Sequence, residues 1–532
     1  MPHTRMEKMN KPNPAQKDLV QPKRIGNLFT QRNIGSFCLS SVLEFLFFLL
    51  RLGIKPKTEG WRKYTAAFLR TEDSRFLLSV FRLKIGLDDR GNDAHINTKL
   101  WVIRQLGSFY KTHPQLWSTR LEWNRNGASI QPNKHLDFVW AEYGSSGKLT
   151  KIRAFFDGDQ EAAPEVSAQY AELFIQAYNQ TVCTGRQRPY HLMKALRGLA
   201  RNNTQENAII EFGQRILDSV FIHFESMEEN GGVNLPDFSK FPHPGGGAFN
   251  ILCRLHSPDY DEVDLWFHIN HVLHDGNPVL EAITGLKRIW GTAGAMVFTQ
   301  PAQDSKSCSL IHPFYNDSGR ELVYAHQQIS FEHLLKERER LNQKYGRLLK
   351  NKITIAGMIL WGLSSQPFLK DCKLTLIIDV LPDSGKNEPR TLGFVTTEPN
   401  DFLDEADREL SFVKYQVFLN DAVELARKRE DQTYVSLKSQ ALTPVTSYEM
   451  TQAMVPNAIQ DIGGKISLTI MPLADYCAPP ADDTKDAIIA IGNIMMPAGD
   501  GKLAGAVCIK SIKEDVNRYW ESVYNTISDW HI

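Results

Sequence analysis

The chain has 532 residues, 42% of them hydrophobic, and its 61 basic residues balance its 61 acidic ones. This length supports a large core and either several domains or one unit of two lobes. A formal net charge of zero argues against nucleic acid as a partner, because its polyanionic backbone selects a basic face. The seven cysteines are far apart without CxxC spacing, which favours buried thiols in a reducing compartment over disulfides or a zinc ribbon.

Residues 1–59 read as a basic leader followed by a hydrophobic helix. Residues 1–35 carry seven basic side chains against two acidic ones, which gives a local charge of +5. The apolar stretch Phe37–Ile54 is interrupted by Glu44 and Arg51, and a spanning helix needs about 20 apolar residues. The long polar leader argues against a signal peptide. A helix on an anionic membrane surface and a helix packed on the protein body both stay open. We expect a cytoplasmic protein, membrane-associated if the first alternative holds.

The first lobe is predicted over residues 60–297. A strand is expected at residues 75–87, and a helix with near-helical apolar spacing follows at 96–112. The pair LDFVWAEYG and KLTKIRAFFDG predicts a hairpin over residues 136–158. Residues 166–229 read mainly as helices, so this lobe mixes both kinds of element.

Two further strands, AFNILCRL and DEVDLWFHIN, lead to the most informative stretch, WFHINHVLHDGNPV. In the second strand apolar residues alternate with Asp264, Trp266, His268 and Asn270, which is the period of a strand with two distinct faces. After it, an Asn-Pro pair suits the cap and first turn of a helix. The stretch therefore lies at a turn from a strand to a helix.

The second lobe is predicted over residues 298–532. Helices are expected at 329–349, at 353–366, at about 402–428 and at the C-terminal end, with strands in CKLTLIIDVLP, GGKISLTIMP, AIIAIGNIMMP and AGAVCIKS. Both halves mix helices with strands. The sequence therefore predicts an α/β (α+β) protein of two related lobes, each with a mixed sheet flanked by helices, and argues against one parallel doubly wound sheet.

The six residues from His271 to Gly276 fit the pattern H-x-x-x-D-G. An imidazole has a reference pKa of about 6.5 and can act as a general base near neutral pH. Asp275 can fix the turn by pairing with an arginine or with backbone donors. Gly276 allows a tight turn and leaves room for a substrate.

This pattern after a strand, in a chain of two lobes, resembles the chloramphenicol-acetyltransferase-like superfamily. That group includes dihydrolipoamide acyltransferases, condensation domains and wax-ester synthase-type enzymes. The segment THPQLWSTRLEW resembles their HPxL segment, and GGKISLTIMP resembles the G-G-x-x-T-x-S strand of the dihydrolipoamide acyltransferases. The resemblance spans roughly residues 60–532 in layout and implies a cleft or tunnel between the lobes.

The resemblance also implies roles in acyl transfer. His271 would deprotonate the acceptor, and Asp275 would form an ion pair with an arginine, for which Arg120 and Arg390 are the candidates. Asn270 stands where many members have a second histidine, and it could orient the ring of His271.

Two hydroxyl groups are candidates for the contact with the tetrahedral oxyanion. Thr469 is the first candidate and Ser467 the second. The donor would be an acyl thioester, either acyl-CoA or an acyl carrier protein, used as a co-substrate with no bound cofactor. The acceptor would be a hydroxyl or amine on a small molecule or a lipid.

Three other interpretations compete with this one. His268, His271 and His274 are spaced three apart as metal ligands can be, but strand alternation separates the first two, so we expect no metal. A non-catalytic binding or scaffold protein could be built on the same fold. A condensation enzyme could take its donor from a separate carrier protein, since the chain has no recognisable carrier domain.

Overall fold

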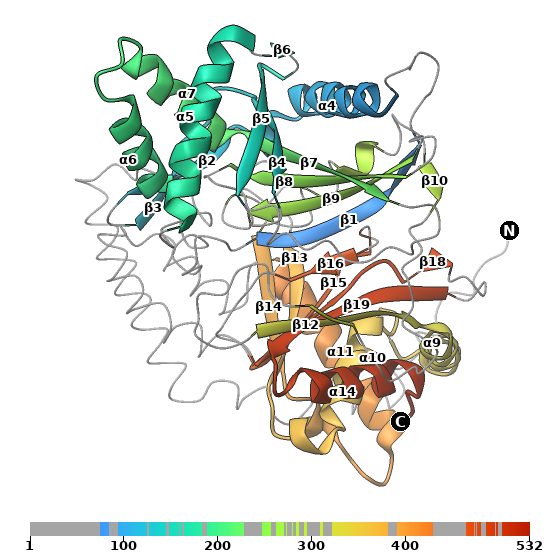
Figure 1. Cartoon of the computed structure of the whole chain (residues 1–532). Coiled ribbons are helices and arrows are strands. Elements are labelled where there is room, and N and C mark those ends of the chain that lie inside the picture. Colours follow the sequence, from blue (N-terminus) through green and yellow to red (C-terminus); the bar gives the residue numbers. More distant parts are fainter. Residues whose placement is uncertain are drawn as a thin grey trace, which may run out of the picture.

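The computed structural model describes the chain in segments. These are residues 75–84, 94–124, 127–144, 148–158, 160–161, 164–183, 189–227, 247–256, 262–270, 273, 279, 283–286, 292–294, 309–311, 322–349, 351–380, 391–428, 464–472, 474, 476–479, 486–494, 496–497 and 503–532. They form two lobes, each built on its own mixed sheet (Figure 1).

The first lobe is built on a nine-stranded sheet in the order β10-β1-β9-β8-β7-β4-β5-β6, with β16 also paired to β1. The β4–β7 and β7–β8 pairs are parallel, and the other pairs are antiparallel. The strands are β1 (Arg75–Lys84), β4 (Phe138–Tyr143), β5 (Leu149–Phe156), β6 (Gln160–Glu161), β7 (Val220–Met227), β8 (Phe249–His256), β9 (Glu262–Asn270), β10 (Thr292–Gly294) and β16 (Tyr476–Ala478). A separate hairpin joins β2 (Thr119–Asn124) to β3 (Gly127–Pro132).

Helices pack on both faces of this sheet. Helix α4 (Ala94–Thr112) places Val102, Ile103 and Leu106 in one core with the apolar residues of β8 and β9. The opposite face of β4 and β5 forms a second core with three helices. These are α5 (Pro164–Cys183), α6 (Pro189–Ala200) and α7 (Glu206–Asp218).

The second lobe is built on an eight-stranded sheet in the order β11-β12-β19-β17-β15-β13-β14, with β18 paired to β19. Here the β13–β15 and β15–β17 pairs are the parallel ones. The strands are β11 (Ser309–Ile311), β12 (Leu322–Ser330), β13 (Leu374–Val380), β14 (Thr391–Thr397), β15 (Ile466–Ile470), β17 (Ala487–Ile491), β18 (Met496–Pro497) and β19 (Leu503–Ile512).

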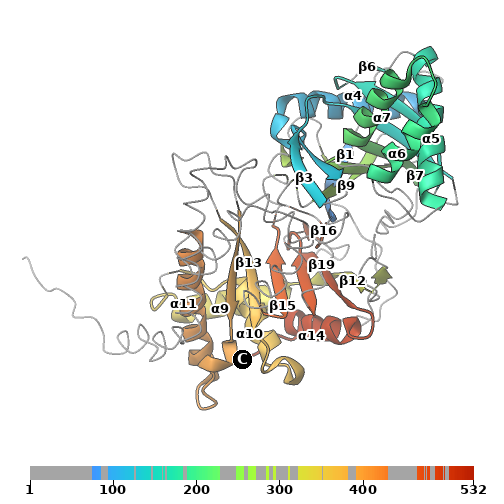
Figure 2. The same ribbon diagram turned by 90° about the vertical axis from the view of Figure 1, so that its left-hand side faces the viewer.

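All the helices described in this lobe contribute to one core on a single face of the sheet. Figure 2 shows β13, β15 and β19 of this sheet next to one another, with β16 between the two lobes. The helices are α9 (Glu332–Tyr345), α10 (Ile355–Ser364), α11 (Arg408–Arg427) and α14 (Val516–Ser528).

The two sheets share one topology. From β5 to β1 through β4, β7, β8 and β9, the pairs run antiparallel, parallel, parallel, antiparallel and antiparallel. From β14 to β12 through β13, β15, β17 and β19, the pairs follow the same sequence. The prediction of two related lobes with mixed sheets is confirmed.

Some sequence predictions of elements need correction. The region 166–229 is mainly helical, as expected, but it ends in a strand, β7, that the sequence analysis did not single out. The helix expected at 329–349 starts only at Glu332, because Ile329 and Ser330 complete the ladder between β12 and β19. In both places a partner strand distant in sequence determines the structure.

Candidate active site

The end of strand β9 is fixed on both sides of its last residue. The backbone N–H of Asn270 donates to the carbonyl of Ala248 at 2.9 Å, and the N–H of Leu273 donates to the carbonyl of Asn270 at 3.1 Å. Asn270 and Leu273 are each 1% exposed, and Leu273 belongs to the core that β9 shares with α4. The backbone is therefore anchored immediately before and shortly after position 271.

His271, Asp275 and Gly276 lie outside the described residues, as does Arg390. Their predicted roles stay predictions. Of the predicted site residues, the structure describes Asn270, Arg120 and the two hydroxyl candidates of the second lobe.

One face of β9 is lined by side chains that do not enter the core with α4. Residues 263, 265, 267 and 269 pack into that core, whereas Trp266, His268 and Asn270 alternate with them and are equally buried. His268 lies directly opposite Asn250 on β8. The two-faced strand expected from the sequence is confirmed, and its second face carries the polar groups.

Ser467 and Thr469 lie on the corresponding face of the second lobe. Their neighbours Ile466 and Leu468 belong to the core with the helices, so both hydroxyl-bearing residues point away from it. Ser467 is 1% exposed, and its Oγ has no hydrogen-bond partner in the part of the chain that the structure describes. Thr469 is only half-buried and can be approached.

Strand β16 links the two faces. It pairs with β1 of the first sheet, and the Tyr476 ring contacts both Trp266 of β9, at 5.8 Å between centroids, and His326 of β12, at 6.1 Å. The hydroxyl of Tyr324 donates to the carbonyl of Pro479 at 3.1 Å. The ring of Tyr476 thus connects the face of β9 that carries Trp266 with the face of the second sheet that carries Thr469.

The ionisable groups of this junction are kept neutral by burial. Desolvation lowers the pKa of His326 to about 4 and raises the pKa of Tyr476 well above its usual value. Burial also raises the pKa of the Cys508 thiol to about 12. Polar contacts made here are therefore little screened by water.

Arg120 has a carboxylate partner in the structure. Its Nη1 donates to Asp218 Oδ1 at 3.1 Å, and the two side chains are 19% and 12% exposed. Gln214 donates to the same carboxylate at 3.0 and 3.2 Å. The pair joins β2 to the end of α7, and the predicted pairing of Arg120 with Asp275 stays untested.

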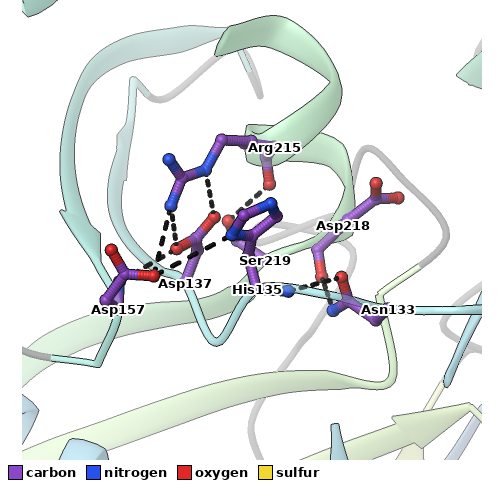
Figure 3. Close-up of polar contacts among 7 residues, drawn as sticks. All are labelled: Asn133, His135, Asp137, Asp157, Arg215, Asp218 and Ser219. Atoms are coloured by element: carbon purple, nitrogen blue, oxygen red, sulfur yellow. Dashed lines mark hydrogen bonds and ion pairs between the residues drawn. The ribbon is translucent and has the colours of Figure 1, made fainter. Parts of the chain in front are cut away.

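A second ion pair lies beside it (Figure 3). Arg215 donates from Nε and Nη2 to the two oxygens of Asp137, both at 2.7 Å, and the backbone N–H of Asp157 donates to Asp137 at 3.1 Å. The Asp137 side chain is 2% exposed. A small hollow at this cluster reaches Ala248, whose carbonyl holds Asn270. Asp137 of the cluster and Ala248 thus line the same small hollow.

Neither metal ligation nor membrane spanning is indicated by the described segments. They contain no group of three or more His, Cys, Asp or Glu side chains placed to hold a metal ion. Within the same segments, no helix combines the length and apolarity that crossing a bilayer requires. The hydrophobic stretch 37–54 lies outside them.

Sequence reasoning missed several polar residues of these faces. His223 and Asn250 on β7 and β8, and His326 and Tyr476 at the junction, were not singled out. A polar residue within an otherwise apolar strand was the available signal, and AFNILCRL shows it for Asn250. His326 and Tyr476 are 150 positions apart, so their contact had no local signal.

Comparison with known proteins gave matches only among solved structures. No family model matches the chain, and no curated protein matches its sequence. A wax ester synthase/diacylglycerol acyltransferase from Marinobacter aquaeolei VT8 is 11% identical, with 88% of this chain and 98% of that chain covered and a TM-score of 0.36. The TRI3 trichothecene 15-O-acetyltransferase from Fusarium sporotrichioides is 9% identical, with 89% and 94% covered and a TM-score of 0.44.

A probable dihydrolipoamide acetyltransferase from Listeria monocytogenes 4b F2365 is 9% identical, with 40% of this chain and 85% of that chain covered and a TM-score of 0.27. These matched structures are acyltransferases. They have the chloramphenicol-acetyltransferase-like fold, and the sequence motif of this chain resembles that of the superfamily named after this fold. The fold class of this chain rests on its own two mixed sheets.

Proposed function

We propose that the chain is an acyltransferase that moves an acyl group from a thioester donor, acyl-CoA, to a hydroxyl or amine acceptor, with His271 as the general base. The observation that carries the proposal is the placement of the H-x-x-x-D-G motif directly after β9. The backbone hydrogen bonds of Asn270 and Leu273 hold the described residues on either side of the motif's first positions. A general base needs such a fixed position, because proton transfer requires hydrogen-bond distance to the acceptor.

The proposed reaction has two steps at the acyl carbon. His271 takes the proton of the acceptor while the acceptor oxygen or nitrogen forms a bond to the thioester carbonyl carbon. The tetrahedral intermediate then collapses, the carbon–sulfur bond breaks, and the imidazolium of His271 returns the proton to the leaving thiolate. The products are the acylated acceptor and free thiol.

Thr469 is the proposed hydrogen-bond donor to the oxyanion of the intermediate. It lies on the face of the second sheet that turns away from the helices, and its half-buried position allows approach. Ser467 Oγ on the same face has no hydrogen-bond partner among the described residues, but it is inaccessible, so a substrate oxygen cannot reach it. Removal of one such donor typically lowers kcat by about 10² to 10³.

The proposal is tested by thiol release from a panel of acyl-CoA donors of increasing chain length, each with a hydroxyl, an amine and a lipid acceptor. We expect acceptor-dependent release of thiol together with the acylated product in wild type. If the wild-type protein is active only with acyl carrier protein donors, the donor in the proposal changes from acyl-CoA to the carrier-protein thioester. A folded wild-type protein that transfers no acyl group from either donor would contradict the proposal.

A further inference from the structure

A tryptophan ring on the α4 side of the first sheet has two cations beside it. The Nζ atom of Lys99 on α4 lies 5.2 Å from the centroid of the Trp140 ring, and the Cζ atom of Arg153 on β5 lies 5.1 Å from it. Lys99 also lies 5.7 Å from the ring of Phe224, which meets Trp140 edge-to-face at 5.4 Å between centroids. The faces of aromatic rings attract cations, so these rings stabilise both charges where they stand.

Cross-strand pairing adds a third cation and a carboxylate to this group. In the antiparallel pair of β4 and β5, Trp140 lies directly opposite Arg153, and Glu142 lies directly opposite Lys151. Residues two apart in a strand point to the same side, so these four side chains share one face of the sheet. The three basic residues Lys99, Lys151 and Arg153 are called the Trp140 cation group below.

The Trp140 cation group lies on the other face of the sheet from the candidate active site. Trp140 belongs to the core with α4, together with the residues of β9 that alternate with Asn270. Asn270 and the Trp266 ring, which contacts Tyr476, take the opposite face of β9. The proposed acyl transfer does not use the Trp140 cation group, so an inference about this group stands without that proposal.

The charges around Trp140 do not cancel among themselves. The Trp140 cation group and Glu142 together have three positive charges and one negative charge, a formal sum of +2. Burial lowers the pKa of Lys99; the carboxylate of Glu142 counteracts this shift, and the positive charge of Lys151 adds to it. Lys99 and Arg153 are half-buried and Lys151 is exposed, so a solute can approach all three. An anion among them would offset their mutual repulsion.

We propose that Lys99, Lys151 and Arg153 bind a phosphate group, carried by a soluble compound or by a lipid headgroup. A phosphate monoester has a charge of about −1.5 to −2 near pH 7 and three acceptor oxygens. A guanidinium donates to two such oxygens at once, and the two ammonium groups act as point charges. A carboxylate would neutralise only half of the excess charge, so a phosphate group matches the site better.

The site is tested on the full chain by lysine acylation with a low dose of acetic anhydride, followed by peptide mass spectrometry that gives a rate for each lysine. Rates in potassium phosphate are compared with rates in potassium chloride of equal ionic strength, which removes general screening. We expect phosphate at about twice its Kd to slow the acylation of Lys99 and Lys151 about threefold. Lys336, an exposed lysine of α9, is the matched control, and its rate should not change.

Vesicles distinguish the two sources of the phosphate group. Flotation compares phosphatidylcholine vesicles with and without phosphatidic acid, using wild type, the double variant Lys99→Gln with Arg153→Gln, and Lys336→Gln. If the source is a lipid headgroup, we expect phosphatidic acid to increase binding, the double variant to weaken this binding at least about fivefold, and Lys336→Gln to leave it unchanged. Protection by inorganic phosphate without vesicle binding would assign the site to a soluble compound.

Two results would overturn the proposal. One is acylation rates of Lys99 and Lys151 that are equal in phosphate and chloride, together with vesicle binding that the double variant does not weaken. The other is equal slowing of Lys336, which would show that phosphate acts on lysines without regard to their site. The acylation experiment uses wild type alone, so it decides the question for soluble phosphate even if the double variant does not fold. Acyl transfer, present or absent, leaves both readouts unchanged.

Discussion

The pair Ser467 and Thr469 offers a prediction in which one substitution changes stability and the other changes activity. The two hydroxyls lie two residues apart on the same face of β15. Ser467 Oγ is buried without a hydrogen-bond partner in the described segments, and an unsatisfied buried hydroxyl costs about 1–3 kcal/mol. Ser467→Ala removes this group and leaves no large cavity. We therefore expect it to raise the free energy of unfolding by about 1 kcal/mol.

Thr469→Val is the matched variant, because valine keeps the branched shape and removes only the hydroxyl. We expect it to leave stability within about 1 kcal/mol and to lower kcat by about 10² to 10³. Ser467→Ala should leave kcat within about threefold of wild type, since its Oγ is out of reach of a substrate.

Urea denaturation and thiol-release kinetics measure both effects. A gain of 1 kcal/mol corresponds to a rise in Tm of about 2–4 °C for a unit of 150–250 residues. Destabilisation of more than about 1 kcal/mol by Ser467→Ala would refute the reasoning, because it would mean that the hydroxyl is bonded in the folded protein. Loss of kcat in Ser467→Ala but not in Thr469→Val would reverse the assignment of the oxyanion donor.

Three further predictions concern charged groups. Asp137→Asn should lower the free energy of unfolding by about 3 kcal/mol, because it breaks a buried ion pair and leaves Arg215 in place. Glu409→Gln, which breaks a more exposed ion pair, should cost less than about 1 kcal/mol in the same urea titration. Equal effects of the two substitutions would contradict the structural role of the Arg215–Asp137 cluster. Arg120→Met and Asp218→Asn should each destabilise the folded protein, and a double-mutant cycle should give a coupling energy of about 1 kcal/mol between them. Strictly additive effects would mean that the two side chains do not interact. The pKa of His326 is lowered from 6.5 to about 4 in the folded state, so the unfolded state binds more protons between these values. Stability should therefore fall as the pH drops from 6.5 towards 4, and His326→Phe should lose about 3 kcal/mol less over that range; identical pH profiles would contradict the assignment.

The sequence identified the elements whose pattern is local. Strand β9 alternates apolar and polar residues over its whole length, and β4 and β5 form the hairpin expected from adjacent apolar runs. The terminal helix α14 was readable for the same reason. In each case the periodicity of the segment reports which face meets a core.

Elements that depend on distant partners could not be predicted in the same way. Strand β7 lies between two parallel neighbours, β4 and β8, and β16 is a three-residue strand that forms only because β1 accepts it. Parallel pairing and strand addition leave no pattern in the segment itself.

The candidate site shows the same division. The position of Asn270 at the end of β9 followed from alternation within a single strand. The pairing of Arg120 with Asp218 joins residues 98 positions apart, and the sequence had suggested only Asp275 as a partner of Arg120.

The most direct test of the central claim compares His271→Ala with His274→Ala in the wild-type acyl-transfer reaction. Both variants remove an imidazole from the same short motif, so they share any cost of disturbing the turn. The account predicts that folded His271→Ala loses at least about 10²-fold in kcat while His274→Ala keeps activity within about tenfold. Acyl transfer that survives in folded His271→Ala at the wild-type rate would contradict the claim that His271 is the general base.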